Sequence, residues 1–163
     1  MATLTKANPE VVGGPIMATT TKLILNGQSW NAGQFLFADS SGLLKTCTSD
    51  ADASTGGIKY LALSTQTDPG NSTTEEEVGV ITHDHIFEGN ELDGAVSVSN
   101  IGMNYGIDVT SNVVTVDVGD TSNPAVVITD VGSQFSPEQY EASDVCGKLR
   151  FQVLTTVIEC AGA

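Results

Sequence analysis

The clearest pattern along the chain is the alternation of apolar and polar residues between Ala95 and Val131. Within it, the valines at 114, 116 and 118 fall on one side of an extended chain, and Thr115 and Asp117 fall on the other. A period of two residues is typical of a strand with one buried and one solvent-exposed face. Turn-forming residues, the first of them Ser111-Asn112, separate the apolar segments. We therefore expect an antiparallel meander of strands at 95–100, 101–109, 112–119 and 125–131.

The first half of the chain carries further strand patterns. Residues 22–25 are strand-like, and the Asn26-Gly27 pair after them predicts a tight hairpin whose return strand, 28–31, carries Trp30. Residues 33–46 predict a second hairpin, with Phe35 and Phe37 on one face. Residues 58–64 and 78–82 predict two more strands, the later one continuing through 83–85, and the polar segments 48–57 and 65–77 between them predict loops.

The C-terminal part of the chain predicts one helix and one strand. Ser136 suits an N-cap, Pro137 suits the first helical position, and Gln139 lies at the capping-box spacing, so we expect a short helix at 136–143. Residues 147–158 then predict a long strand, with Lys148 and Arg150 on the face opposite Leu149, Phe151 and Val153.

These elements predict an all-β fold, either a small antiparallel barrel or a sandwich, with one short helix. We expect a single β-rich domain over residues 22–163 and an extended N-terminal arm over residues 1–21. Pro9, Pro15 and the Gly13-Gly14 pair exclude a regular helix in the arm, although it contains several apolar residues. Two interpretations stay open: the arm lies on another protein, or it packs partly on its own domain.

Charge limits the classes of partner. The net charge is −14, and residues 61–147 contain 15 carboxylates and no Lys or Arg. Such a surface repels phosphate backbones, so we expect no direct binding to nucleic acid. The acidic surface favours solubility and repulsion between neighbouring copies of the protein. The more specific alternative is that this surface binds multivalent cations.

Cysteine usage and hydropathy point to a cytoplasmic site of synthesis. Cys47, Cys146 and Cys160 are odd in number and irregularly spaced, which favours buried, reduced thiols over a disulfide framework. No apolar segment approaches the roughly 20 residues needed to span a bilayer, and we expect neither a membrane partner nor a secretory signal.

No residue pattern predicts catalysis or a cofactor. Asp50 and Asp52 share the spacing of part of a calcium loop but lack its later ligands. His83 and His85 would share one face of a strand and thus have the geometry to hold one metal, with nearby carboxylates completing the set. Because a zinc site needs three or four ligands and no other histidine exists in the chain, we expect no metal site. No phosphate-binding loop or nucleophile elbow occurs, so we expect a non-enzymatic protein.

The layout of the chain carries a resemblance. The segments WNAGQFLFADSSGLLKT, GGIKYLAL and EVGVITHD follow an arm rich in Pro, Gly and Thr, and NYGIDV, VVTVDVGD and GKLRFQVL follow in the C-terminal half. In this layout and composition the chain resembles the capsid decoration (cement) proteins of tailed bacteriophages. The resemblance implies a small β-rich domain, often a homotrimer, on the outside of the viral head, where it stabilises the shell by bridging major capsid protein subunits. It also implies that the arm contacts the capsid, through Thr3, Leu4, Pro9, Val11, Val12, Pro15 and Ile16.

Three alternatives remain open. The first is another virion component, such as a tail-tube, fibre or head-completion domain with a similar β-rich composition. The second is a module that binds cations or sugars through the acidic turns and Trp30. The third is a small hydrolase that uses His83 or His85.

Overall fold

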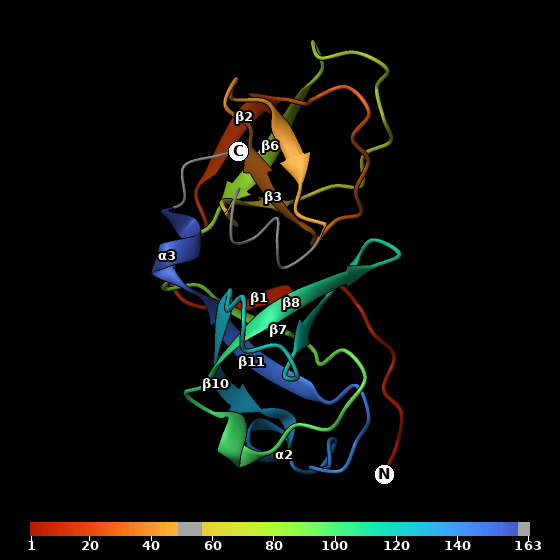
Figure 1. Cartoon of the computed structure of the whole chain (residues 1–163), viewed down its shortest axis with the longest axis vertical. Coiled ribbons are helices and arrows are strands. Elements are labelled where there is room, and N and C mark those ends of the chain that lie inside the picture. The colour runs from red at the N-terminus through yellow and green to blue at the C-terminus, as the bar shows by residue number, and fades with distance from the viewer. Residues whose placement is uncertain (49–56, 160–163) are drawn as a thin grey trace.

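The protein is a sandwich of two antiparallel β-sheets in a computed structural model that describes residues 1–48 and 57–159. The larger sheet contains, in spatial order, β1 (Glu10–Gly13), β7 (Ile86–Asn90), β11 (Lys148–Val153), β10 (Val126–Val131), β8 (Asn104–Thr110) and β9 (Val113–Asp117). The smaller sheet contains β2 (Thr19–Leu23), β6 (Glu75–Val80), β5 (Tyr60–Ala62), β3 (Phe35–Ala38) and β4 (Leu44–Thr46). Figure 1 shows the smaller sheet above the larger one. The all-β prediction is confirmed, and the sandwich form replaces the closed barrel.

Three short helical segments complete the described structure. They are the 3-10 helix η1 (Val98–Asn100) and the single-turn helices α2 (Gly132–Phe135) and α3 (Thr155–Ile158). None of the described helices has the length and apolar character needed to cross a membrane.

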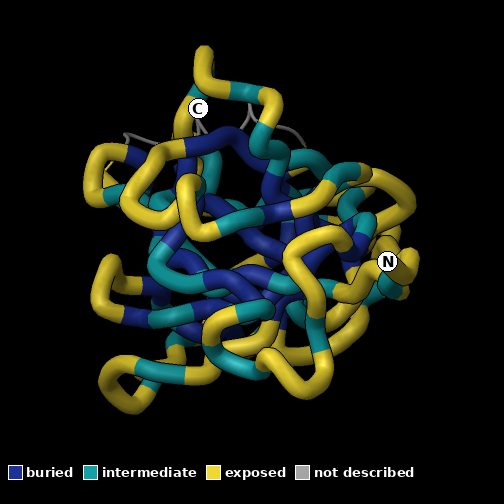
Figure 2. Tube along the Cα trace, turned by 90° about the horizontal axis from the view of Figure 1, so that it is seen from below, coloured by how far each residue is buried: buried dark blue, intermediate teal, exposed yellow. Residues whose placement is uncertain are grey.

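The main hydrophobic core lies between the two sheets, where Figure 2 shows the buried chain segments gathered. Its centre is a group of three aromatic rings. Phe35 of the smaller sheet contacts Phe87 and Phe151 of the larger sheet, with ring centroids 5.3 Å and 6.3 Å away. Edge-to-face aromatic contacts at these distances stabilise a core beyond the area that they bury.

A second hydrophobic cluster covers the opposite face of the smaller sheet. Phe35 and Phe37 face the main core, whereas Leu36 between them belongs to this second cluster together with Trp30 and Ile24. The strand alternation predicted for 33–39 is therefore confirmed, but both faces of the strand are buried. The predicted hairpin of 33–46 is also confirmed, since β3 pairs with β4.

The larger sheet curls until its last strand meets the chain that leaves β7. The backbone N–H of Leu92 donates to the carbonyl oxygen of Val116 in β9, at 2.9 Å. We call this junction between β9 and residues 90–92 the seam. The β8–β9 hairpin turns at Ser111 and Asn112, both with positive φ, as the turn signal predicted. Thr115, expected in solvent, is buried beside the seam.

Several expectations for the meander and the first hairpin are wrong because long-range pairing overrides local signals. β10 pairs with β8 rather than with β9, and residues 95–100 contain η1 instead of a strand. The Asn26-Gly27 hairpin does not form, since β2 pairs with β6 and Trp30 pairs with Gln66. The acidic segment 75–77, expected in a loop, forms the start of β6.

The C-terminal expectations need two corrections. The helix lies at 132–135 and not at 136–143, and Ser136 is its C-cap, so Pro137 follows the helix instead of beginning it. The strand expected over 147–158 ends at Val153, and α3 follows. The predicted orientation of the strand's side chains is confirmed, since Leu149, Phe151 and Val153 are buried in the main core.

Candidate functional site

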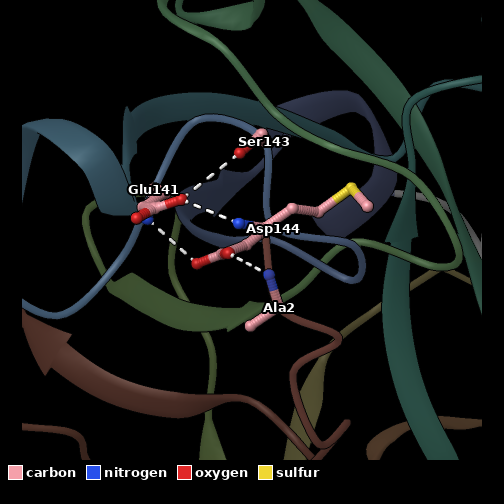
Figure 3. Close-up of polar contacts among 5 residues, drawn as sticks. Ala2, Glu141, Ser143 and Asp144 are labelled. Atoms are coloured by element: carbon pink, nitrogen blue, oxygen red, sulfur yellow. Dashed lines mark hydrogen bonds and ion pairs between the residues drawn. The ribbon is translucent and has the colours of Figure 1, made fainter.

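The loop that precedes β11 holds the first four residues. Figure 3 shows Ala2 beside Glu141 and Asp144 of this loop. The backbone N–H of Ala2 donates to Asp144 Oδ1 at 2.8 Å, and the N–H of Leu4 donates to the carbonyl oxygen of Val145 at 2.9 Å. The N–H of Val145 donates in turn to the carbonyl oxygen of Ala2 at 2.8 Å. The other oxygen of Asp144 accepts the N–H of Glu141 at 2.9 Å. These residues form a clasp between the N-terminal segment and the loop at 141–145.

The clasp depends on the charge of Asp144. The backbone N–H groups of Glu141 and Ala2 donate to its carboxylate and lower its pKa below the usual 3.8. A carboxyl with a depressed folded-state pKa contributes stability above its unfolded pKa and loses that contribution as pH falls through the folded value. The clasp is therefore intact at neutral pH and weakens in acid below pH 3.8.

Residues 6–9 of the N-terminal segment close the seam. Asn8 makes the most contacts: its side-chain amide donates to the carbonyl oxygens of Ala32 and Asn112, at 3.1 Å and 3.0 Å. Its Oδ1 accepts the backbone N–H of Val114 at 2.8 Å. Lys6 Nζ donates to the carbonyl oxygen of Leu92 at 2.8 Å. A mainly apolar cavity of about 230 Å³ remains at the seam, lined by Lys6, Leu92, Thr110, Ser111, Val113 and Thr115.

After the seam, the chain forms β1, the edge strand of the larger sheet. β1 pairs with β7 on one side, and no other described strand pairs with its second side. Val11 and Val12 are 37% and 45% exposed, and Ile16, in the crossover to β2, is 99% exposed. We call Val11, Val12 and Ile16 the edge patch. It presents aliphatic side chains beside an unpaired strand edge, a combination that proteins use for strand addition.

The structure separates the seven predicted contact residues into two groups. Thr3, Leu4 and Pro9 lie against their own chain: Thr3 is exposed but its backbone bridges to Val145, Leu4 is half-buried in the clasp, and Pro9 is buried. The other four are exposed, namely Val11, Val12, Pro15 and Ile16. The N-terminal segment is therefore extended, as expected, but it packs on its own domain, which was the second of the two interpretations. Contact of the exposed residues with another protein stays a prediction.

The boundary expected between residues 21 and 22 falls inside β2. Before it, Met17 packs against the main core and lies directly over Gly79, where a Cβ atom would stand 2.3 Å from the Met17 sulfur. Residues 1–21 thus supply β1, most of β2 and part of the core packing. Removing them removes structural elements of the fold, not a detachable arm.

The two histidines do not converge on a metal. His83 lies exposed in the turn between β6 and β7, with Nε2 3.2 Å from Asp84 Oδ1. His85 is buried, and its Nδ1 accepts the backbone N–H of Thr82 at 2.9 Å. This contact closes a turn, so the predicted continuation of the strand through 83–85 is wrong. No group of three or more His, Cys, Asp or Glu side chains suited to a metal occurs within the described residues. Asp50 and Asp52 lie outside them.

Trp30 and the two described cysteines are buried and form no surface site. Trp30 is buried in the second cluster, so it cannot serve as the exposed aromatic platform of the sugar-binding alternative. Cys47 and Cys146 are buried, and Cys160 lies outside the described residues. The expectation of reduced thiols stays a prediction.

One carboxyl is buried close to the seam. Glu91 accepts the backbone N–H groups of Asp93, at 2.7 Å, and of Gly94. Burial raises the pKa of Glu91 above the usual 4.5, and these hydrogen bonds oppose that rise only in part. No sequence signal predicts this burial, since Glu91 stands among the polar residues of a turn.

Sequence reasoning also missed a hollow on the outer face of the larger sheet. Arg150 lies there between Glu88 and the ring of Phe135, with Nε 3.1 Å from Glu88 Oε2 and the guanidinium carbon 4.1 Å from the ring centroid. The alternation of β11 correctly placed Arg150 on the outer face. The helix was predicted a turn too late, and that error concealed the contact with Phe135.

Comparison with known proteins adds no information about the function of this chain. No protein-family model matches the chain, and no curated protein is significantly similar to it in sequence.

Proposed function

We propose that this protein is a structural component of a bacteriophage virion that binds the outer surface of the capsid and bridges major capsid protein subunits without catalysing a reaction. The edge patch carries the proposal. It joins three exposed aliphatic side chains to the unpaired side of β1. An extended segment of a capsid subunit would pair with this edge through main-chain hydrogen bonds and cover the patch.

The fixed position of β1 distinguishes the proposed contact from one made by a flexible arm. A flexible leader would lose conformational entropy on binding, which weakens the contact. Here the clasp, the seam and Met17 hold the segment on both sides of β1 before any partner arrives. The surface offered to the capsid is therefore already ordered.

The charge of the chain supports the same role, and a homotrimer is part of the proposal. The carboxylates of residues 61–147 give the body a negative field that repels neighbouring particles in solution. In this proposal the protein is a homotrimer on the capsid exterior, made in the host cytoplasm, and its partner is the major capsid protein. Three linked copies strengthen a contact that is weak for each copy.

Co-sedimentation with undecorated capsids of the encoding phage tests the proposal. The double variant Val12→Asp/Ile16→Asp places two charges in the edge patch, and we expect it to bind at least about tenfold more weakly, a loss of roughly 1.4 kcal/mol. The matched control is Val98→Asp/Ile101→Asp, because these residues are also exposed, at 56% and 39%, but lie at η1. Equal binding by both variants and the parent chain would remove the edge patch from the contact. No binding by the parent chain would remove the capsid role, and binding to purified tails would favour a tail component.

A further inference from the structure

The hollow on the outer face of the larger sheet has no part in the proposed function. It measures about 210 Å³, and it is lined by Glu88, Phe135, Ser136, Gln139, Tyr140 and Arg150. We call it the Arg150 hollow. It lies beside α2, which Figure 1 shows at the far end of the larger sheet from the smaller one. Its volume is below the roughly 300–1,000 Å³ of pockets that enclose drug-sized ligands, so it suits one small ring.

The floor of the hollow is rigid. Arg150 and Glu88 are register partners in β11 and β7, and their side chains form an ion pair. The guanidinium also stacks on the Phe135 ring, which fixes its plane. Only Nε of Arg150 is used, so the two Nη groups make no hydrogen bond within the described residues and remain available as donors.

The wall of the hollow is a short loop that the backbone holds in place. The carbonyl oxygen of Ser136 accepts the N–H groups of Gln139 and Tyr140, both at 3.0 Å. Tyr140 packs edge-to-face on Phe135, with ring centroids 6.1 Å apart. Across the part of the chain that the structure describes, the Ser136 hydroxyl, the Gln139 amide and the Tyr140 hydroxyl make no side-chain hydrogen bond.

The chemistry of these groups selects a class of ligand. Glu88 balances the charge of Arg150, and the strongly acidic body repels anions, so neither a phosphate nor a carboxylate is favoured. The guanidinium disfavours a cation. The unpaired side-chain groups of the hollow include hydrogen-bond donors, acceptors, and hydroxyls that act as both. This set matches a ligand with neighbouring hydroxyls, because each ligand hydroxyl both donates and accepts. Phe135 and Tyr140 also line the hollow, which is mainly polar.

We propose that the Arg150 hollow binds a neutral carbohydrate, with adjacent hydroxyls of one sugar ring on Glu88 and Arg150 and further hydrogen bonds to Gln139 and Tyr140. This site differs from the sugar-binding alternative based on Trp30, which is buried. The proposal does not depend on the capsid role, because it uses the outer face of β7 and β11 and not the edge patch.

The test is an NMR titration of the isotopically labelled full-length protein. The probes are glucose, galactose, mannose, N-acetylglucosamine and their disaccharides, with acetate and inorganic phosphate titrated separately. We expect at least one neutral sugar to shift the backbone amides of 135–140 and the Arg150 Nε signal in a saturable manner. Absence of such shifts with every sugar, or tighter binding of acetate or phosphate, would overturn the proposal.

Two variants and a matched control locate the binding. Gln139 is exposed, so Gln139→Ala keeps the fold, and the loss of one neutral hydrogen bond predicts about two- to tenfold weaker binding. Arg150→Lys keeps the charge but loses the planar fork, and we expect at least about tenfold weaker binding. The control is Gln152→Ala, on the same face of β11 but outside the hollow, which should bind as the parent does. A Gln139→Ala variant with unchanged affinity and shifts would also contradict the site.

Discussion

At the scale of the residue, Asn8 shows how one polar side chain joins separate parts of the chain. Its amide group contacts the segment before β3, the β8–β9 turn and β9 itself. The hydrogen bond from the Val114 N–H is partly buried, whereas those to Ala32 and Asn112 are exposed. Buried or half-buried backbone groups without partners are costly, so the side chain stabilises the seam more than its size suggests.

We predict that Asn8→Ala lowers the free energy of unfolding by about 1–3 kcal/mol, because three hydrogen bonds are lost together. Urea denaturation at neutral pH measures the effect. Asn26→Ala is the control, since Asn26 is exposed and its side chain makes no hydrogen bond to described residues. A loss for Asn8→Ala no larger than that for the control would show that the N-terminal segment does not support the seam.

Glu91 and Asp144 give pH dependences of opposite sign. The pKa of Glu91 is raised, so the folded state favours its protonated form, and the associated stability is lost as pH rises from 4.5 through the folded pKa. We predict that Glu91→Gln is more stable relative to the parent at pH 7 than at pH 4. The urea unfolding midpoints of the variant and the parent at pH 4 and pH 7 measure this difference. If the advantage of the variant over the parent were smaller at pH 7 than at pH 4, the burial of Glu91 would be contradicted.

At the scale of the element, the crossover from β1 to β2 fixes the N-terminal segment against the body. Gly14 has a φ of +97° there, and a Cβ atom would stand 2.3 Å from the carbonyl oxygen of Asp84. Only glycine fits such a close approach of two backbones. The crossover also places Ile16 in solvent and Met17 over the core, so its geometry sets the edge patch.

We predict that Gly14→Ala destabilises the protein by about 2–4 kcal/mol, because backbone strain and a steric clash add. Gly27→Ala is the matched control: its φ is +86°, but nothing lies within 4 Å of the added Cβ atom. Strain alone predicts a loss of about 1 kcal/mol for the control. Thermal or urea unfolding compares the two, and equal losses would mean that the crossover does not approach Asp84.

Elements whose pairing is local were predictable from sequence, and those that depend on distant strands were not. The 33–46 hairpin and the Ser111-Asn112 turn follow from alternation and turn residues within a few positions. The Asn26-Gly27 signal is equally strong, but β2 gains a partner in β6 and Trp30 gains a buried position, which together outweigh a local hairpin. The candidate site shows the same limit, because the clasp joins residues more than 140 positions apart.

At the scale of the whole molecule, the described residues form an acidic sandwich in which β1 is an edge strand with one unpaired side. Exposed sheet edges are a hazard for a protein unless something covers them, and a symmetric oligomer or a capsid partner would do so. The strongly negative body limits uncontrolled association between copies. The edge is thus available to a specific partner while general aggregation is disfavoured.

We predict that the purified protein is a homotrimer, in agreement with the expectation from the family resemblance. Light scattering coupled to gel filtration measures the mass, and a mass of three chains of 16.9 kDa supports the bridging geometry. Raised salt should strengthen the association, because it screens repulsion between acidic copies. A monomer at every salt concentration would remove multivalency from the proposed function.

In the proposed function, an N-terminal segment that is fixed to its own fold, not a flexible leader, presents the edge that binds the capsid. Hydrogen exchange with mass spectrometry, on the free protein and on the protein bound to capsids, tests it most directly. We predict slow exchange of peptides covering 2–18 in the free protein, and further slowing confined to residues 10–18 on binding. Immediate exchange of residues 2–18 in the free protein, followed by protection only on the capsid, would contradict it.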